Sequence, residues 1–368
     1  MQALILAGGE GTRLRPLTST VPKPVVPLVD RPFAAFMLEW LRRHGVEDVV
    51  MSCGFMAAGV HNVLGDGSHF GLRLRYVEEP SPMGTGGAIK FAESLLDERF
   101  LVLNGDVLTD LDLSAQIAQH EQTGARATLA LVRVDDPSAY GLVNLREDRA
   151  VREFVEKPSP DQIDARALIS AGAYVLEREV LQLLPAGENV SVERDVFPVL
   201  VEHGLFGYPA DAGYWLDIGT PERYLQGTWD ILEGTVSTAV RERLDAANRA
   251  VGERVELEGR LIAPVLVDDG CHVAEGAQIG GRVVLGRDVS VGAGTHIERS
   301  VVLQGAEIRA GCSISACIVG AGVRVGDGCT LRDGVVLGEG VTLGAGNALS
   351  GGTRVFPGVE LPDGAILG

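Results

Sequence analysis

Apolar runs alternate with helical patterns over residues 1–230. Gln2–Ala7 is almost entirely apolar and predicts a buried strand. A helix is predicted next, because apolar residues recur at its spacing: Phe33, Phe36, Met37, Trp40 and Leu41, with Gly45 just past its end. Further strands are predicted over Val46–Ser52, Leu101–Leu103 and Ala127–Val134. This alternation predicts the α/β class, a mostly parallel sheet with helices on both faces.

A different period governs the last part of the chain, from Leu261 onward. An aliphatic residue recurs every six positions, in the order Leu261, Val267, Val273, Ile279, Leu285, Val291, Ile297 and Leu303. The register then slips by one residue to Ile308 and Ile314. After a second slip it continues through Val319, Val325, Leu331, Leu337, Leu343, Leu349, Val355 and Leu361. This period fits neither a helix nor an ordinary alternating strand.

A six-residue repeat instead predicts a parallel β-helix, in which each hexad forms one short strand and a turn. Three hexads per coil give about six coils, and the pattern resembles the left-handed hexapeptide-repeat β-helices. We therefore expect a first domain over residues 1–230, a charged linker over 231–260 and the β-helix over 261–368. The small position of the hexad holds Cys271, Cys312 and Cys329, which predicts packing rather than metal binding.

Composition narrows the functional classes. The chain of 368 residues is 46% hydrophobic, which suffices for buried cores, and its net charge is −18, which argues against nucleic-acid binding. An acidic protein that binds anionic substrates needs a local positive site, and Lys23 and Lys157 fall within motifs described below. Five cysteines without CxxC spacing give no disulfide or zinc pattern. No signal peptide and no apolar run of about 18 residues is present, so we expect a cytoplasmic protein with no membrane partner.

A glycine-rich block follows the first predicted strand, reading Leu6-Ala-Gly-Gly-Glu-Gly-Thr-Arg-Leu-Arg-Pro-Leu-Thr18. Gly8, Gly9 and Gly11 let the backbone approach a phosphate chain closely, and Arg13 adds a guanidinium suited to phosphate oxygens. No Gly-Lys pair occurs, so the Walker loop is excluded. Leu14 stands where the dinucleotide fingerprint needs its last glycine.

Two carboxylates follow apolar segments far apart in the chain. Asp106 ends Leu103-Asn-Gly-Asp, and Asp217 lies in Gly213-Tyr-Trp-Leu-Asp-Ile-Gly. Ligands of open α/β sheets bind outside the carboxyl ends of the strands, which favours a site over an Asn-Gly turn for Asp106. Two carboxylates together with phosphate oxygens suit Mg²⁺.

The glycine-rich block and the motifs after it resemble, in order, those of the sugar-1-phosphate nucleotidyltransferases. Further matching motifs are Pro22-Lys23-Pro24, Glu79-Pro-Ser-Pro-Met-Gly-Thr-Gly-Gly-Ala-Ile89, Glu153-Phe-Val-Glu-Lys-Pro158 and Ser191-Val-Glu-Arg-Asp-Val-Phe-Pro198. The loop around Gly84 is most similar to guanylyltransferases. The tail Leu349-Ser-Gly-Gly-Thr-Arg-Val-Phe-Pro-Gly-Val is most like bacterial mannose-1-phosphate guanylyltransferases. The resemblance implies a Rossmann-like nucleotidyltransferase domain followed by a left-handed β-helix.

The resemblance also implies a role for individual residues. Catalysis would involve Arg13, Lys23 and Asp106, and Mg²⁺ would bind Asp106 and Asp217. The nucleotide would contact Leu6, Ala7, Gly8, Gly9, Gly11, Thr12, Arg13, Gly84, Thr85 and Gly105. The sugar phosphate would contact Gly141, Glu156, Lys157 and Gly172. Glu193 and Asp195 receive no role.

The predicted reaction joins a nucleoside triphosphate, GTP first, to a sugar-1-phosphate, mannose-1-phosphate first, and releases pyrophosphate. UTP or dTTP with glucose-1-phosphate, and GTP with a heptose phosphate, remain alternatives. A further alternative is acyl transfer on the β-helix through His272 or His296, and another is a non-catalytic regulatory subunit. The presence of five charged motif residues together argues against the regulatory subunit: Arg13, Lys23, Asp106, Lys157 and Asp217. We expect the β-helix to support a homo-oligomer.

Overall fold

Two units divide the chain in the computed structural model, which describes residues 1–163 and 167–367. The sheet unit comprises Met1–Glu10 and Ala34–Trp215, and the repeat unit comprises Gly11–Phe33 and Leu216–Gly368. The glycine-rich block is therefore split, because its second half belongs to the unit that contains the hexads.

The sheet unit is built on a nine-stranded sheet whose main path runs β10-β9-β11-β6-β1-β4-β5. Its strands are β1 Gln2–Ala7, β4 Asp48–Cys53, β5 Arg73–Glu78, β6 Arg99–Asn104, β8 Ala127–Val132, β9 Gly141–Leu145, β10 Val151–Glu156, β11 Leu168–Glu177 and β12 Leu205–Pro209. The four strands β6, β1, β4 and β5 pair in parallel, and β8 pairs in parallel with β12. The predicted first strand is confirmed at its bounds, and the other three predicted strands are present with ends shifted by up to two residues.

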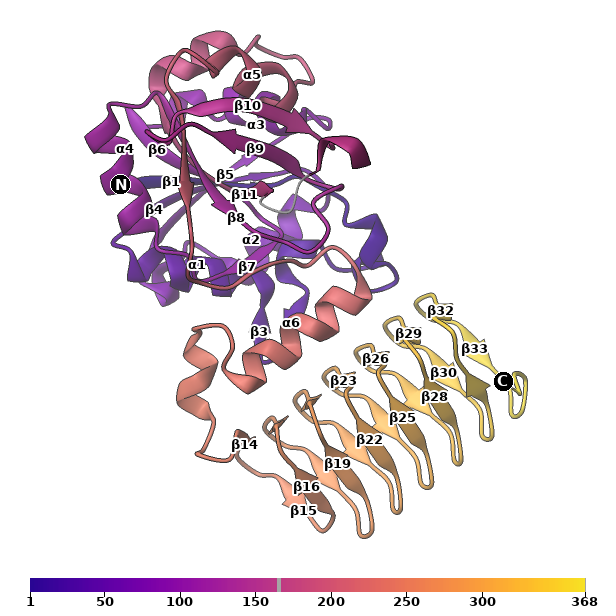
Figure 1. The fold of residues 1–368 in the computed structure, drawn as a ribbon. Helices are drawn as coiled ribbons and strands as arrows, with labels where there is room; N and C mark the ends of the chain where they lie inside the picture. Colours follow the sequence, from indigo (N-terminus) through magenta and orange to yellow (C-terminus); the bar gives the residue numbers. More distant parts are fainter. Residues whose placement is uncertain (164–166, 368) are drawn as a thin grey trace. The chain divides into compact units, whose positions relative to one another are not determined.

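Helices cover both faces of this sheet, with α3 and α5 on one face and α1 and α4 on the other (Figure 1). The helices of the chain are α1 Phe33–Arg43, α2 Ala57–Leu64, α3 Gly84–Phe91, α4 Leu113–Thr123, α5 Phe197–Leu200 and α6 Pro221–Glu233. Alternate residues of β1 serve the two faces, so Leu4 packs in the same core cluster as Ile89 of α3 and Phe197 of α5. The sheet is mixed rather than mostly parallel, because β11 pairs antiparallel with β6, β8 and β9, and β9 pairs antiparallel with β10. The parallel strands β6-β1-β4-β5 with helices on both faces confirm the predicted α/β class.

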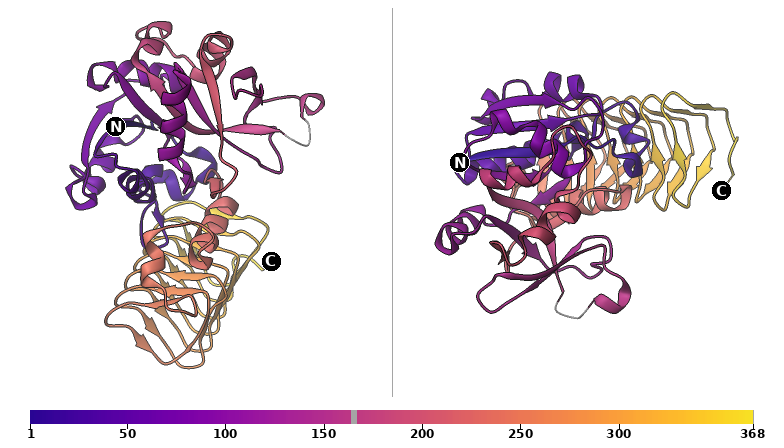
Figure 2. Two further views of the ribbon diagram at one scale, coloured as in Figure 1. Left: turned by 60° about the vertical axis from the view of Figure 1, so that its left-hand side comes forward. Right: turned by 90° about the horizontal axis from the view of Figure 1, so that it is seen from above.

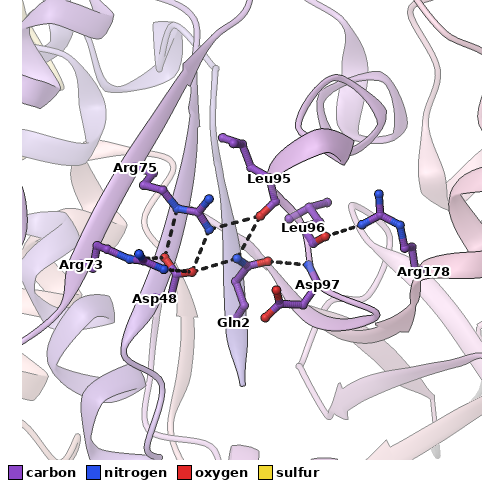
Figure 3. A network of polar contacts seen from close by, with 8 residues as sticks. All are labelled: Gln2, Asp48, Arg73, Arg75, Leu95, Leu96, Asp97 and Arg178. Carbon is purple, nitrogen blue, oxygen red and sulfur yellow. Dashed lines mark hydrogen bonds and ion pairs between the residues drawn. The ribbon is translucent and has the colours of Figure 1, made fainter.

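The amino ends of β1, β4 and β5 are closed by a network of polar side chains (Figure 3). Asp48 accepts hydrogen bonds from Gln2 at 3.0 Å, Arg73 at 2.8 Å and Arg75 at 2.7 Å. The side-chain oxygen of Gln2 accepts from the backbone N–H of Asp97 at 2.9 Å. Partial burial tends to raise the pKa of Asp48, but the donated hydrogen bonds outweigh it and hold that pKa below its ordinary value.

The hexad region of the repeat unit forms three parallel sheets, as a left-handed hexapeptide-repeat β-helix requires (Figures 1 and 2). Strands three apart in the chain pair, as in Val265 with Val283, so three hexads make one coil. The strands are β14 Arg249–Val251, β15 Glu256–Leu257, β16 Arg260–Ile262, β17 Val265–Val267, β18 His272–Val273, β19 Gln278–Gly280, β20 Val283–Leu285, β21 Ser290–Val291, β22 His296–Glu298, β23 Val301–Val302, β24 Glu307–Ile308, β25 Ser313–Ser315, β26 Ile318–Val319, β27 Arg324–Val325, β28 Thr330–Arg332, β29 Val336–Leu337, β30 Thr342–Leu343, β31 Ala348–Leu349, β32 Arg354–Val355 and β33 Glu360–Leu361. The first coil, β14 to β16, begins inside the range predicted as a linker.

The first slip of the hexad register was predicted one hexad too late. Val302, and not Leu303, pairs with Leu285 on one side and Val319 on the other. The short step therefore falls between Ile297 and Val302. Val302 and Leu303 are adjacent aliphatic residues, so the composition at this point is compatible with either register.

The cysteines of the β-helix are packing residues. Cys271, Cys312 and Cys329 lie in the central core cluster, together with Cys317. Burial raises the pKa of Cys271 and Cys312 to about 11, so both are thiols at neutral pH. All five cysteines of the chain are free and buried.

The remaining elements are short and lie in the segments that connect the larger strands and helices. The segment Gly11–Phe33 holds three 3-10 turns and the hairpin of β2 Pro27–Leu28 with β3 Arg31–Pro32. β7 Val107–Thr109 follows Asp106, and β13 Trp215–Asp217 leads out of the sheet unit. Among the described residues, no helix is long and apolar enough to cross a membrane.

Candidate active site

Glycines let three backbones pack together at the carboxyl edge of the parallel strands. The N–H of Gly105 donates to the carbonyl of Leu6 at 2.9 Å. A Cβ added to Gly105 would stand 2.7 Å from that same carbonyl oxygen, and one added to Gly54 would stand 2.8 Å from the carbonyl of Gly8. Any side chain at these positions would push apart the turns after β1, β4 and β6. Asp106 follows Gly105 directly and is partly exposed at this edge.

The turn after β1 passes from the core to open space within three residues. Ala7 is buried, Gly8 is partly buried and Gly9 is exposed. A Cβ on Gly8 would approach the Oε1 atom of Glu79 to 2.7 Å, whereas one on Gly9 would meet nothing within 4 Å. The backbone at Gly9 is thus open to a ligand, as a phosphate-binding turn requires.

The predicted base loop packs against the segment after residue 188. Gly84 has φ of +68°, and a Cβ there would lie 2.5 Å from the carbonyl oxygen of Val190. The N–H of Gly86 donates to that carbonyl at 2.8 Å. The hydroxyl of Thr85 donates to Glu193 at 2.6 Å and accepts from the N–H of Val192 at 3.0 Å. The loop is therefore held in one conformation by two separate glycines and a threonine.

Glu193 joins three segments, although no role was predicted for it. It accepts hydrogen bonds from Ser191 at 2.7 Å, from Thr85 at 2.6 Å and from the hydroxyl of Tyr174 at 3.3 Å. Tyr174 and Thr85 are distant in sequence, so no local spacing could have revealed this arrangement. The one local signal is Ser191, whose hydroxyl accepts from the N–H of Arg194 and caps the helical turn.

The predicted sugar-binding residues Gly141 and Glu156 lie directly opposite each other in the antiparallel pair β9–β10. A Cβ on Gly141 would stand 2.5 Å from the ring of Phe154 and 3.1 Å from Oε2 of Glu156, so both side chains of β10 pack closely over this glycine. Lys157 comes next, is exposed, and has φ of +52°. Its N–H donates to the carbonyl of Tyr140 at 3.1 Å, which fixes this turn.

The electrostatic setting of Glu156 is unusual for an exposed strand end. Burial raises the pKa of Glu156, and the negative charge of Glu193 raises it further. The cations Lys157 and Arg194 act in the opposite direction but more weakly, so the net pKa lies above the ordinary value.

The fourth predicted sugar residue, Gly172, lies at an irregularity in β11. The register of β11 against β8 shifts between Ser170 and Tyr174. Gly172 has φ of +71°, and a Cβ there would stand 2.7 Å from Nδ2 of Asn104, two residues before Asp106. The irregularity thus sets the backbone of Gly172 beside the segment that carries Asp106.

Two aromatic side chains lie beside these predicted sugar-binding residues: Tyr140, whose pair Tyr140-Gly141 resembles a sugar-pocket element of the family, and Trp215, for which no role was predicted. The indole N–H of Trp215 donates to the carbonyl of Ala171 at 2.8 Å. The ring of Tyr140 meets that of Trp215 edge-on, with centroids 5.3 Å apart. Both residues lie beside predicted motif positions, so the motifs themselves were the available signal.

The second half of the glycine-rich block folds around Lys23 in the repeat unit. Gly11 has φ of +61°, and a Cβ there would stand 3.2 Å from both Thr18 and Lys23. The hydroxyl of Thr18 donates to the carbonyl of Gly11 at 2.8 Å. Lys23 is only 8% exposed, whereas Thr12 and Arg13 are exposed. The second half of the block therefore packs against the buried Lys23 and leaves Arg13 exposed.

The side chains of Asp217 and Arg13 both lie next to Gly219 in the repeat unit. A Cβ on Gly219 would stand 2.7 Å from Nη2 of Arg13 and 2.8 Å from Oδ1 of Asp217, so glycine keeps this space clear. Oδ2 of Asp217 pairs with Arg223 at 3.1 Å. The hydroxyl of Thr220 caps α6 just after the aspartate and fixes the local backbone.

The predicted site residues are thus distributed over both units. The sheet unit holds Leu6, Ala7, Gly8, Gly9, Gly84, Thr85, Gly105, Asp106, Gly141, Glu156, Lys157 and Gly172. The repeat unit holds Gly11, Thr12, Arg13, Lys23 and Asp217. Among described residues no group of three His, Cys, Asp or Glu side chains could hold a metal, so ligand oxygens would have to complete any metal shell.

The fold defines an α/β protein whose glycine turns lie at the carboxyl edge of the parallel strands, where open α/β sheets bind their ligands. The nucleotidyl transferase family model matches residues 2–234, and the GMPPB C-terminal domain matches residues 261–362. The chain belongs to the nucleotidyl transferase family.

Several relatives match over most of their length. Mannose-1-phosphate guanylyltransferase of Mycobacterium tuberculosis is 41% identical, over 84% of this chain and 81% of the relative. UTP–glucose-1-phosphate uridylyltransferase of Synechocystis is 30% identical, over 83% of each chain. Among solved structures, HddC from Yersinia pseudotuberculosis complexed with GMP-PN matches with a TM-score of 0.51 and 28% identity, covering 61% of this chain and 96% of HddC.

Proposed function

We propose that this chain transfers GMP from GTP to mannose-1-phosphate, releasing pyrophosphate and forming GDP-mannose. The observation that carries the proposal is the bare-backbone edge formed by the turns after β1 and β6 with Asp106. It occurs in a chain 41% identical to the mycobacterial mannose-1-phosphate guanylyltransferase. The base loop, buttressed by Val190 and Glu193, supports selection of one base by fixed backbone groups.

The reaction needs no nucleophilic side chain. An oxygen of the sugar phosphate forms a bond to the α-phosphorus, and the bond between that phosphorus and the bridging oxygen of pyrophosphate breaks. Since both reactants are anions, catalysis depends on positioning and on stabilising the charge that moves to the leaving group. Arg13 and Lys23 would stabilise the pyrophosphate, and Lys157 would hold the attacking phosphate.

The nucleotide would lie along the turn from Leu6 to Thr12, with its base at Gly84 and Thr85 and Gly105 below it. The sugar would lie on the backbones of Gly141 and Gly172. Glu156 would accept hydrogen bonds from the sugar hydroxyls, which is supported by its position opposite Gly141 in the pair β9–β10.

Mg²⁺ would be held by Asp106 and Asp217 together with phosphate oxygens. The donor set fits, because both residues offer hard carboxylate oxygens, which Mg²⁺ prefers. When bound, the ion would neutralise charge on the phosphates of both substrates.

The domain boundaries and the assembly are also proposals. The catalytic domain would span residues 1–230 and the hexad domain 261–368, joined by 231–260, whose second half contributes the first coil. We propose a homo-oligomer, because the last coil exposes Phe356 by 50% and Leu367 by 80%. A cytoplasmic location follows from its substrates, which are both phosphorylated metabolites.

A second candidate is transfer of UMP from UTP to glucose-1-phosphate. It is favoured by one observation, the 30% identity over 83% of the chain to the Synechocystis uridylyltransferase. Both reactions would use the same charged residues, so only the base loop and the sugar-binding residues would differ between them.

Pyrophosphate release tests the proposal. Purified enzyme with Mg²⁺ is offered each of GTP, ATP, UTP, CTP and dTTP, with mannose-1-phosphate or glucose-1-phosphate as acceptor. We expect the largest kcat/KM with GTP and mannose-1-phosphate. A larger value with UTP and glucose-1-phosphate would replace the first candidate by the second.

A further inference from the structure

Arg354, on β32 of the β-helix, reaches the backbone of the glycine-rich block. Its Nη1 atom donates to the carbonyl of Arg13 at 2.9 Å and to the carbonyl of Arg15 at 3.0 Å. Both partners belong to the repeat unit, which groups Gly11–Phe33 with the hexads. These contacts join residues more than 300 positions apart in the sequence.

The two carbonyls lie at the end of a short 3-10 turn, Thr12–Leu14. The N–H groups of Leu14 and Arg15 bond within the turn, to the carbonyls of Gly11 and Thr12, whereas carbonyls at the end of such a turn need donors from outside it. A charged donor makes a stronger hydrogen bond than a neutral one. Arg354 therefore fixes the main chain on both sides of Leu14, including the residue whose side chain approaches Asp217.

The same arginine also faces the segment after Asp217. A hydrogen bond with the Thr220 side chain holds the pKa of Glu222 below its ordinary value; burial acts against this shift, and the positive charge of Arg354 adds weakly to it. Glu222 lies in the first turn of α6, next to Arg223, which pairs with Asp217 at 3.1 Å. One guanidinium thus lies close to both segments that carry site residues in this unit.

Two further contacts fix the rest of the segment Gly11–Phe33 to the hexad region. The hydroxyl of Thr20 donates to Glu339 at 2.7 Å. Asp30 and Asp268 pair with the same arginine, Arg243, at 2.5 Å and 3.1 Å. The segment is therefore attached at three separate places, and Arg354 makes the attachment nearest to Arg13.

We propose that Arg354 is a positioning residue, which orients the Arg13 guanidinium by fixing the backbone on either side of Leu14. The proposal rests on the proposed function, because it assigns Arg13 to the phosphate chain of the nucleotide. It gives the β-helix a direct part in catalysis in addition to any part in assembly.

The test compares Arg354→Ala with a matched control, Arg324→Ala. Arg324, like Arg354, directly precedes an aliphatic hexad position, but it lies on a different sheet of the β-helix. Its side chain is 69% exposed, and its ion pair with Glu307 is long, at 4.0 Å. Since misplacing a catalytic group by about 1 Å can cost about 100-fold, we expect Arg354→Ala to lower kcat by roughly 10- to 100-fold. The control should keep kcat within about twofold, and both variants should keep the wild-type melting temperature.

A double-mutant cycle separates positioning from general support of the fold. If Arg354 acts through Arg13, the variants Arg13→Ala and Arg13→Ala/Arg354→Ala should have equal kcat, and Arg354→Lys should recover part of the loss. Wild-type kcat in Arg354→Ala, or a loss that multiplies with that of Arg13→Ala, would overturn the proposal. The proposed function is tested separately, by the activity of the wild-type enzyme. If the wild type uses other substrates, the double-mutant cycle is measured with those substrates. If it has no activity with any of them, both the proposed function and the role of Arg354 are overturned.

Discussion

The two ends of the parallel strands in the sheet unit are built in opposite ways. At the amino ends, long polar side chains fill the space, and Asp48 alone accepts hydrogen bonds from Gln2, Arg73 and Arg75 (Figure 3). At the carboxyl ends, glycines withhold side chains, and Gly9 has nothing within 4 Å of its absent Cβ. The comparison teaches that the polar groups at the amino edge are paired with one another, whereas the carboxyl edge leaves backbone open to a ligand.

The largest effect should come from the charged residue at the open edge. Asp106→Asn keeps the size of the side chain but removes its charge, and we expect kcat to fall by about 10³-fold at saturating Mg²⁺, as for loss of an electrostatic contact in a transition state. Pyrophosphate release measures kcat, and thermal melting checks that the fold is intact. Turnover within tenfold of wild type would remove Asp106 from the metal site.

The next effect should come from the glycine that faces open space. Gly9→Ala adds a methyl group that meets no protein atom, so the melting temperature should not change. If the nucleotide occupies that space, the KM for the nucleoside triphosphate should rise by about tenfold, or about 1.4 kcal/mol. An unchanged KM would mean that the phosphate chain does not approach this turn.

A smaller effect, on pH dependence, should come from Glu156. Its raised pKa means that it gains a proton at a higher pH than an ordinary glutamate, so KM for the sugar phosphate should begin to rise earlier as the pH falls. Glu193→Gln removes one charge that raises this pKa, so the rise should move to lower pH. Ionisation of the substrate is common to both enzymes and cancels in the comparison. An identical pH profile in the two enzymes would contradict the coupling.

The smallest effect on turnover should come from the amino edge of the parallel strands, where we expect a substitution to change stability instead. Asp48→Asn should leave kcat unchanged and reduce the free energy of unfolding at pH 7 by about 2 kcal/mol, the scale of charged hydrogen bonds. Because the pKa of Asp48 is lowered on folding, its stabilisation is present above about pH 4 and is lost as the pH falls further. The difference from wild type in urea melts should therefore shrink between pH 7 and pH 3. A difference that grows toward acid pH would contradict this assignment.

The elements that could be predicted from the sequence are those whose apolar residues recur at a short, regular spacing. Gln2–Ala7 and the hexads were predictable because each residue repeats a local pattern of burial. The slip at Val302 was missed because Leu303 beside it is equally aliphatic, and only strand pairing separates them. Patterns of this kind carry no information about partners from other segments.

The site was predicted unevenly for the same reason. Gly8, Gly105 and Gly172 lie in recognisable motifs, and the structure gives each a crowded backbone that excludes a side chain. Glu193 and Trp215 were missed, because each has a partner in a distant segment: Thr85 is 108 positions from Glu193, and Ala171 is 44 positions from Trp215. The same holds for the association of Gly11–Phe33 with the hexads, which depends on Arg354 and Arg243 rather than on any local motif.

The central claim is that the open edge binds GTP and mannose-1-phosphate for transfer of GMP. The most direct measurement is pyrophosphate release by the wild-type enzyme with all five nucleoside triphosphates and both sugar phosphates. The account predicts the largest kcat/KM for GTP with mannose-1-phosphate, abolished in Asp106→Asn. A release that shows no preference for GTP, or that persists in Asp106→Asn, would contradict it.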